Sequence, residues 1–101
     1  MELDVDLDFA GTPVLEVKGD IDFSTVEKLD RRLREVADQG HKQVLVDLSK
    51  VGYMDSEGIK VLIRLRNAMG EDSEVTIKGA KGPVMRVLQV SGLPRIFNIL
   101  E

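Results

Sequence analysis

One stretch of the sequence, residues 46–59, most constrains the fold, because it joins an apolar segment to an amphipathic helix through a polar turn. Its first part belongs to the nearly continuous apolar run 43–48, which predicts an interior strand covered on both faces of a sheet. Its second part begins a helical repeat of apolar side chains that ends at Gly70. A strand that leads directly into such a helix predicts a layered α/β domain, with Ser56 at the start of the helix.

Short strands and amphipathic helices also account for the rest of the chain. Apolar residues alternate with Asp4, Asp6 and Asp8, which predicts an edge strand that holds its carboxylates in water. A second, antiparallel strand is expected at residues 14–17, since the connection is short. A capping box at residues 24–27 predicts a helix that begins there and ends before Gly40. The strand at 43–48 and the helix from Ser56 follow. The last expected elements are a strand at 74–78, a helix that starts at Pro83 and a short strand at 96–100.

This order of elements predicts one domain over residues 1–101, of class α/β, with a mixed sheet of four to five strands and helices packed against it. Its parallel crossovers are expected to be right-handed. Functional sites in such sheets collect at the carboxyl ends of the strands. Residues 20–22 and 54–56 both follow strands and lead into helices, so these two segments are expected to share one rim of the sheet.

The composition argues against several classes of function. The 101 residues are 43% hydrophobic and include no cysteine, which predicts a folded domain without disulfides or thiolate metal sites. His41 is the only histidine in the sequence, so a zinc cluster is not expected. A net charge of -4 offers no basic surface for nucleic acid. No apolar run is long enough for a signal peptide or a membrane span, and a cytoplasmic location is expected.

A hydroxyl at the start of a helix, such as that of Ser56, can act as a cap, as a nucleophile or as a phosphate acceptor. Either Asp55 or Ser56 can cap the first-turn amides. A nucleophile needs a base within reach, and His41 is expected at the opposite end of the sheet, so serine hydrolase chemistry is not predicted. Free amides and the helix dipole favour a phosphate at this position, and this role is compatible with a capping role.

Three blocks of the sequence carry a resemblance to a known family. They are GDID at residues 19–22, VDLSKVGYMDSEGI at residues 46–59, and the pair VL at 87–88 with SGL at 91–93. Together they resemble the STAS domain of bacterial anti-sigma-factor antagonists over nearly the whole chain. The central block is the specific one, and the spacing between the blocks also fits.

The resemblance implies a binding protein controlled by phosphorylation. In that family, the serine that matches Ser56 is phosphorylated by a serine kinase that is itself the anti-sigma factor, and a PP2C-like serine phosphatase removes the phosphate. The unmodified protein binds the anti-sigma factor and frees the sigma factor, which regulates transcription. The chain is therefore expected to be a kinase substrate and no enzyme, with no catalytic residue. From the residues themselves, no metal and no cofactor are expected, and no bound nucleotide, because the glycines form no phosphate-binding loop at the required spacing.

The partner-binding surface is expected on the shared rim. Its expected residues are Asp20, Ile21, Asp22, Tyr53, Met54, Asp55, Ser56, Glu57, Gly58 and Ile59. Asp20 and Asp22 fit either turn positions or docking contacts. Asp55 either caps the helix or orients the Ser56 hydroxyl for phosphoryl transfer. Gly58 in a helical first turn indicates the close approach of another group, either within the chain or from a partner.

Two departures from the family pattern bear on the partners. Family members commonly continue into a further helix, whereas this sequence stops at Glu101, so exposed apolar surface is expected to favour a homodimer. Glu57 occupies a position where many relatives carry a small residue, which can alter the choice of partner. The alternative function is a STAS subunit of another system, either a stress-signalling complex or an accessory to a lipid-transport ATPase. Serine rather than threonine at position 56 favours the antagonist.

Overall fold

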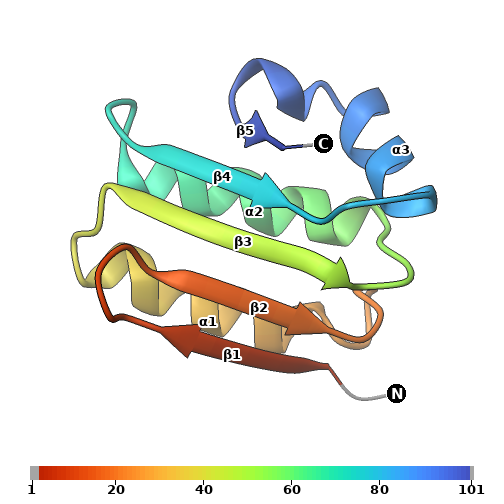
Figure 1. Ribbon diagram of the computed structural model, residues 1–101, viewed down its shortest axis with the longest axis horizontal. Coiled ribbons are helices and arrows are strands. Elements are labelled where there is room, and N and C mark those ends of the chain that lie inside the picture. The colour runs from red at the N-terminus through yellow and green to blue at the C-terminus, as the bar shows by residue number, and fades with distance from the viewer. Residues whose placement is uncertain (1–2, 101) are drawn as a thin grey trace.

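Five strands form one mixed sheet in the computed structural model, which describes residues 3–100 (Figure 1). Strand β1 pairs antiparallel with β2, and the other neighbours are parallel. The strands, in their order across the sheet, are β1 (Asp4–Asp8), β2 (Val14–Lys18), β3 (Gln43–Lys50), β4 (Glu74–Lys78) and β5 (Asn98–Ile99). The predicted α/β class and mixed sheet are confirmed, although β5 is shorter than the segment 96–100 expected from the sequence.

Two long helices lie side by side on the same face of this sheet (Figure 1). They are α1 (Val26–Asp38) and α2 (Ser56–Met69), and the shorter α3 (Pro83–Val90) and a 3-10 helix, η1 (Leu93–Arg95), follow β4. Apolar side chains between the sheet and the helices form the core, among them Leu15, Val17, Leu29, Leu33, Val46, Leu62 and Ile77. Within the described part of the chain, every helix is too short or too polar to cross a lipid bilayer.

Strand β3 is covered by helices on one face, so the prediction of a strand buried on both faces is wrong. Val44, Val46 and Leu48 are buried, but Leu45 and Asp47 between them are only half-buried. Both long helices lie on the same side of the sheet (Figure 1). The half-buried side chains of β3 alternate with the buried ones and therefore lie on the face without these helices, the open face of the sheet. A run of apolar residues could not reveal this, because Leu45 sits in it at a half-exposed position.

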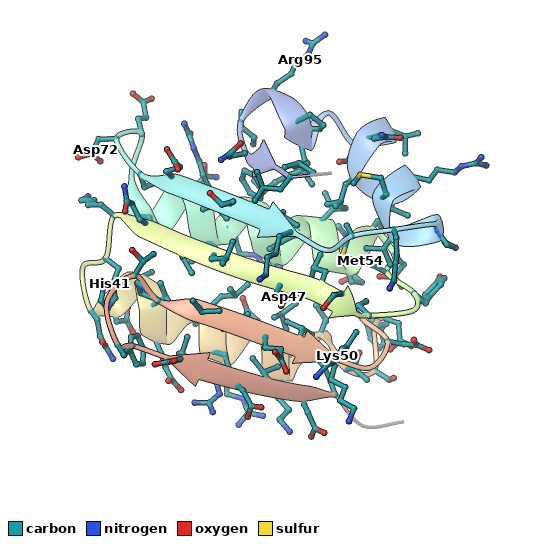
Figure 2. All side chains as sticks on the ribbon, in the orientation of Figure 1. His41, Asp47, Lys50, Met54, Asp72 and Arg95 are labelled. Atoms are coloured by element: carbon teal, nitrogen blue, oxygen red, sulfur yellow. The ribbon has the colours of Figure 1, made fainter. Side chains whose placement is uncertain are left out.

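Charged side chains occupy this open face, as Asp47 and Lys50 illustrate (Figure 2). Burial would raise the pKa of Asp47, but hydrogen bonds from Ser49 and the charges of Lys78 and Lys50 outweigh it and hold the pKa below its ordinary value. The Ser49 amide donates to Asp47 Oδ1 at 2.9 Å, and Lys78 Nζ lies 3.8 Å from Oδ2. Asp47 therefore remains ionised in the middle of the open face.

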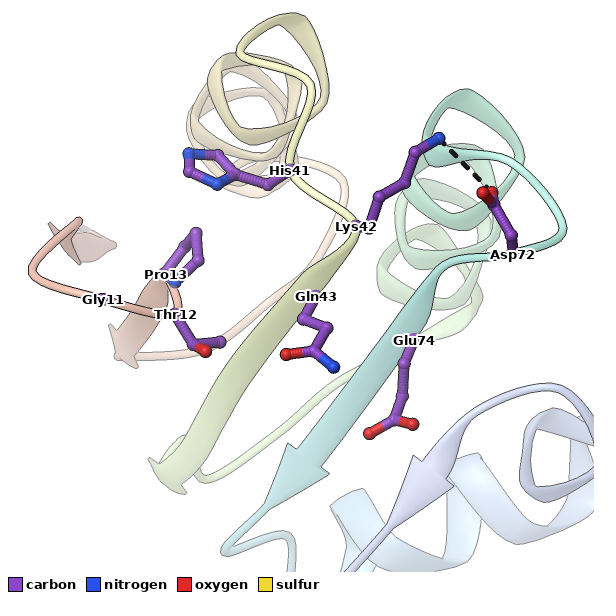
Figure 3. A pocket seen from close by; sticks show the side chains of 8 residues that line it. All are labelled: Gly11, Thr12, Pro13, His41, Lys42, Gln43, Asp72 and Glu74. Atoms are coloured by element: carbon purple, nitrogen blue, oxygen red, sulfur yellow. Dashed lines mark ion pairs between the residues drawn. The ribbon is translucent and has the colours of Figure 1, made fainter.

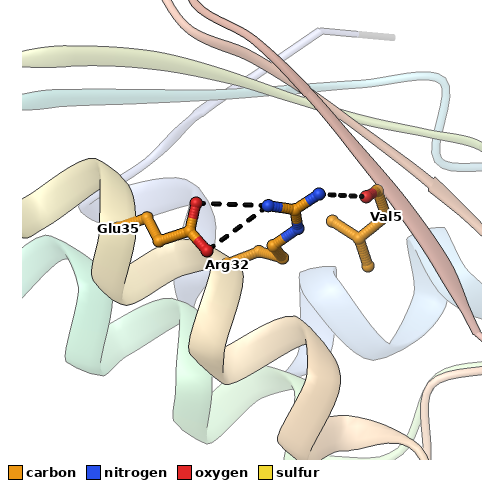
Figure 4. Close-up of polar contacts among 3 residues, drawn as sticks. All are labelled: Val5, Arg32 and Glu35. Atoms are coloured by element: carbon orange, nitrogen blue, oxygen red, sulfur yellow. Dashed lines mark hydrogen bonds and ion pairs between the residues drawn. The ribbon is translucent and has the colours of Figure 1, made fainter.

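The free edge of β1 is partly covered by Arg32 of α1 (Figure 4). Its Nη2 donates to the Val5 carbonyl at 3.4 Å, and its Nη1 pairs with the Glu35 carboxylate at 3.2 Å. An edge carbonyl with such a partner is a weaker template for a strand from another molecule. The structure thus confirms the predicted edge strand and adds a side chain that shields it.

The capping box predicted at Ser24 is wrong. Thr25 is the N-cap residue of α1, without a side-chain capping bond, and the helix begins one residue later than expected. The Ser24 hydroxyl donates instead to Asp22 Oδ1 at 2.7 Å, and the Thr25 hydroxyl donates to the Asp20 carbonyl at 2.7 Å. The Thr25 hydroxyl also accepts from the Asp22 amide at 3.0 Å, so both hydroxyls bond within the turn that precedes the helix.

Candidate functional site

The segments that follow β2 and β3 lie side by side, as the sequence predicts. The Ile21 amide donates to the Tyr53 carbonyl at 2.9 Å, and the Asp55 amide donates to the Ile21 carbonyl at 3.1 Å. These bonds extend the parallel pairing of β2 and β3 past the ends of the strands as a bridge. We call the surface formed by residues 20–25 and 53–59 the Ser56 rim.

Ser56 is the first residue of α2, and its side chain is exposed. Asp55 precedes it as the N-cap residue, and its Oδ1 accepts a hydrogen bond from the Glu57 amide at 2.9 Å. Asp55, of the two capping candidates, is therefore the residue that satisfies a first-turn amide. The Ser56 hydroxyl stays at the surface, at the positive end of the helix dipole.

Replacement of Asp55 by alanine is expected to lower the free energy of unfolding by about 1 kcal/mol, because the Glu57 amide loses its acceptor. Asp55→Asn keeps an oxygen acceptor at the same place and is expected to lose only a few tenths of a kcal/mol. Urea unfolding followed by circular dichroism measures both changes. An equal loss in the two variants would contradict a capping role of the side-chain oxygen.

Negative charge gathers on the Ser56 rim. Its four carboxylates are those of Asp20, Asp22, Asp55 and Glu57, all half-buried. The hydrogen bond from the Ser24 hydroxyl is the main cause that holds the pKa of Asp22 below its ordinary value, and the Thr25 hydroxyl adds to it. Glu57 pairs with Lys60 one turn along α2, at 3.1 Å between Oε2 and Nζ. At neutral pH the rim is therefore an acidic surface.

Four of the predicted partner-binding residues are buried, and their assignment as contact residues is corrected. They are Ile21, Met54, Gly58 and Ile59. Ile21 is 0% exposed and Met54, labelled in Figure 2, is 1% exposed, so neither side chain can touch a docked protein. These residues pack beneath the rim and fix its shape. Tyr53, Ser56 and the carboxylates are the predicted residues that reach the surface.

Gly58 is required by a close approach inside the molecule. A Cβ atom at this position would lie 2.6 Å from Met54 Cγ, 2.8 Å from Met54 Sδ and 3.0 Å from Ile21 Cγ2. Both neighbours are buried, so neither has free space into which to move. The close approach expected at Gly58 therefore comes from within the chain and not from a partner. It lets the first turn of α2 pack directly against Ile21 and Met54 of the bridge.

Comparison with known proteins identifies the family. The family model described as "Mlab, STAS domain" matches residues 5–101. The chain belongs to the STAS domain family. An anti-sigma-B factor antagonist of Staphylococcus aureus is 28% identical over 88 residues, which cover 86% of this chain and 82% of that protein.

Solved structures agree with this assignment. The crystal structure of an anti-sigma factor antagonist from Mycobacterium paratuberculosis superposes with a TM-score of 0.87 and 26% identity, over 96% of this chain and 84% of that one. The fold is also that of SpoIIAA from Bacillus. Its unphosphorylated form has a TM-score of 0.75 at 15% identity, over 97% of this chain and 88% of that one. Its phosphorylated form has a TM-score of 0.74 at 18% identity, over 97% and 92%.

The STAS domain exposes one aromatic residue on the rim that the sequence analysis did not name. Phe23 is 83% exposed, more than Tyr53, which is 47% exposed. The signal in the sequence was an aromatic residue between Asp22 and Ser24, in a polar turn outside any strand or helix pattern. Periodicity gives no direction for a side chain in such a turn, and only the structure shows that Phe23 points outward.

The single histidine of the STAS domain lies at the opposite end of β3 from Ser56, as predicted. His41 borders a cleft of about 430 Å³ at the amino ends of β3 and β4 (Figure 3), and its ring stacks on Phe9 with 5.4 Å between centroids. The eight residues of β3 alone span roughly 26 Å, so the imidazole cannot act as a base for the Ser56 hydroxyl. Among residues 3–100, no group of three His, Cys, Asp or Glu side chains is placed to hold a metal ion.

Proposed function

We propose that this STAS domain is an anti-sigma-factor antagonist whose unphosphorylated form binds an anti-sigma factor with serine-kinase activity and so releases the sigma factor. The exposed hydroxyl of Ser56 at the first position of α2, inside an acidic rim, is the observation that carries the proposal. The names of the relatives support it, since they include antagonists of anti-sigma-B and anti-sigma-F factors.

Ser56 is placed to receive a phosphoryl group. In the proposed reaction, the Ser56 oxygen forms a bond to the γ-phosphorus of ATP in the kinase, the bond to ADP breaks, and the hydroxyl proton passes to a base of the kinase. Asp55 is fixed by its capping bond directly before the serine and can help to orient the hydroxyl. The dipole of α2 offsets part of the added charge, so the fold can retain the phosphate.

The phosphate would act by local exclusion of the partner. It adds about -1.5 to -2 charges at pH 7 beside the carboxylates of Asp55 and Glu57 and near those of Asp20 and Asp22. A partner that docks on this acidic rim would then meet a bulky group with excess negative charge. SpoIIAA has this fold in both its unphosphorylated and its phosphorylated form, which supports a switch that leaves the fold in place. A PP2C-like serine phosphatase would reverse it.

Incubation of the purified chain with ATP and the candidate anti-sigma-factor kinases of the same genome is expected to add one phosphate at Ser56. Intact mass spectrometry and peptide mapping measure the uptake. Ser56→Ala should take up none, whereas Ser91→Ala, which removes an exposed serine outside the rim, should take up as much as the wild type. Absence of uptake with every candidate kinase would contradict the proposal and favour a STAS subunit of another system.

A further inference from the structure

Two of the few aromatic side chains are exposed on the Ser56 rim. The sequence has three phenylalanines, one tyrosine and no tryptophan. Phe97 is 5% exposed in the core, and Phe9 is 37% exposed and stacked on His41, away from the rim. Phe23 and Tyr53, in contrast, are 83% and 47% exposed. Aromatic side chains at a protein surface are typical of the residues that dominate binding interfaces.

Phe23, Tyr53 and Ser56 all lie within two residues of the bridge between Ile21 and Met54. Phe23 follows Ile21 by two residues, Ser56 follows Met54 by two residues, and Tyr53 comes directly before Met54. Both aromatic residues are thus tied by short chain segments to the same pair of backbone bonds that positions Ser56. A partner seated over the Ser56 hydroxyl would reach them in the same docked position.

The turn that carries Phe23 is held by hydrogen bonds on both sides of the residue. The Ser24 amide donates to Asp22 Oδ1 at 2.9 Å, and the Thr25 and Val26 amides donate to the Asp22 carbonyl at 3.1 and 2.9 Å. The Thr25 hydroxyl is 2.7 Å from the Asp20 carbonyl, and Thr25 is only 6% exposed. The outward position of Phe23 is therefore built into an ordered turn, which lowers the entropy lost when a partner covers it.

We propose that Phe23, on the same rim as Tyr53, is the apolar anchor of the docking surface and inserts into an apolar pocket of the anti-sigma-factor kinase. This inference rests on the proposed function. The carboxylates of the rim surround the ring with polar groups, as at interfaces where one aromatic residue supplies most of the affinity. Because these carboxylates are negatively charged, we expect lysine or arginine side chains around the pocket of the kinase. Such complementary charges would fix the orientation of docking.

Calorimetric titration of the full chain with the kinase that phosphorylates it tests the anchor. Phe23→Ala is expected to weaken the Kd by about 30-fold or more, the size typical of an anchor residue. Val90→Ala is the matched control, because Val90 is 79% exposed at the end of α3, and its Kd should stay within about 2-fold of the wild type. Both variants should unfold at the wild-type urea midpoint, since neither side chain is buried.

The outcomes separate this inference from the proposed function. Equal Kd values for Phe23→Ala and the wild type would overturn the anchor and leave the switch at Ser56 intact. If Phe23→Ala binds the kinase more weakly but phosphorylation of Ser56 does not change the affinity, the anchor is supported and the switch is overturned. If Phe23→Ala loses a self-association that the wild type shows in sedimentation, while its affinity for the kinase is unchanged, the Phe23 ring belongs to a homodimer interface and the anchor is overturned. A wild-type chain that binds no candidate kinase would overturn both.

Discussion

Phosphorylation of Ser56 is expected to weaken binding to the anti-sigma-factor kinase by about 100-fold, which corresponds to about 2.7 kcal/mol. The reason is the charge already on the rim, where the Asp22 pKa is lowered and the Asp55 carboxylate caps the same helix that begins at Ser56. Like charges that a partner forces together and desolvates cost several kcal/mol. Titration of the purified phosphorylated and unmodified chains with the kinase measures the difference, which should narrow at high salt because exposed charges are screened.

Two variants separate charge from bulk at this position. Ser56→Asp and Ser56→Asn add side chains of nearly the same size, but only the first adds a negative charge. We expect the Asp variant to lose more affinity than the Asn variant and less than the phosphorylated chain, which carries up to two added charges. Equal losses in the two variants would show that bulk is what excludes the partner. A large change in the circular dichroism spectrum on phosphorylation would contradict a local switch.

Much of the fold could be predicted from the sequence because local rules and tertiary packing agree there. Alternation of apolar residues with Asp4, Asp6 and Asp8 indicated an edge strand, and β1 is one. The chain order of strands and helices was sufficient to place the ends of β2 and β3 on one rim, since parallel neighbours point the same way. Ser56 at the first position of α2 followed from the polar turn before an apolar helical repeat.

The details of the rim could not be predicted, because a turn has no period that assigns its side chains to one side. Met54 and Tyr53 are adjacent, yet Met54 is 1% exposed and Tyr53 is 47% exposed. The direction of each follows from the bridge to Ile21, a contact between segments about thirty residues apart. The prediction that β3 is covered on both faces was wrong for a similar reason. The side of the sheet on which each helix packs is a property of the whole sheet and cannot be read from the residues of one strand.

Gly79→Ala is expected to lower the free energy of unfolding by about 3 kcal/mol. Gly79 follows β4 with φ of +79°, and a Cβ there would lie 2.7 Å from Ser49 Cβ, 2.8 Å from Ser49 N and 2.9 Å from Ser49 Cα. The left-handed backbone costs an alanine about 1 to 2 kcal/mol, and overpacking adds about 1 to 3 kcal/mol. Two of the three contacts are backbone atoms of β3, which cannot rotate away, so β4 must move from its neighbour.

Gly40→Ala is the matched control for that change, because Gly40 has nearly the same φ, +77°, but no atom within 4 Å of the added Cβ. Its free energy of unfolding should fall only by the cost of the left-handed backbone, about 1 kcal/mol. For a domain of this size, the difference of about 2 kcal/mol corresponds to a melting temperature lower by roughly 8 to 16 °C in Gly79→Ala. Thermal unfolding followed by circular dichroism measures it. Equal melting temperatures would mean that β4 yields to the added methyl group without loss of pairing to β3, and that the tight contact at Ser49 does not hold the two strands together.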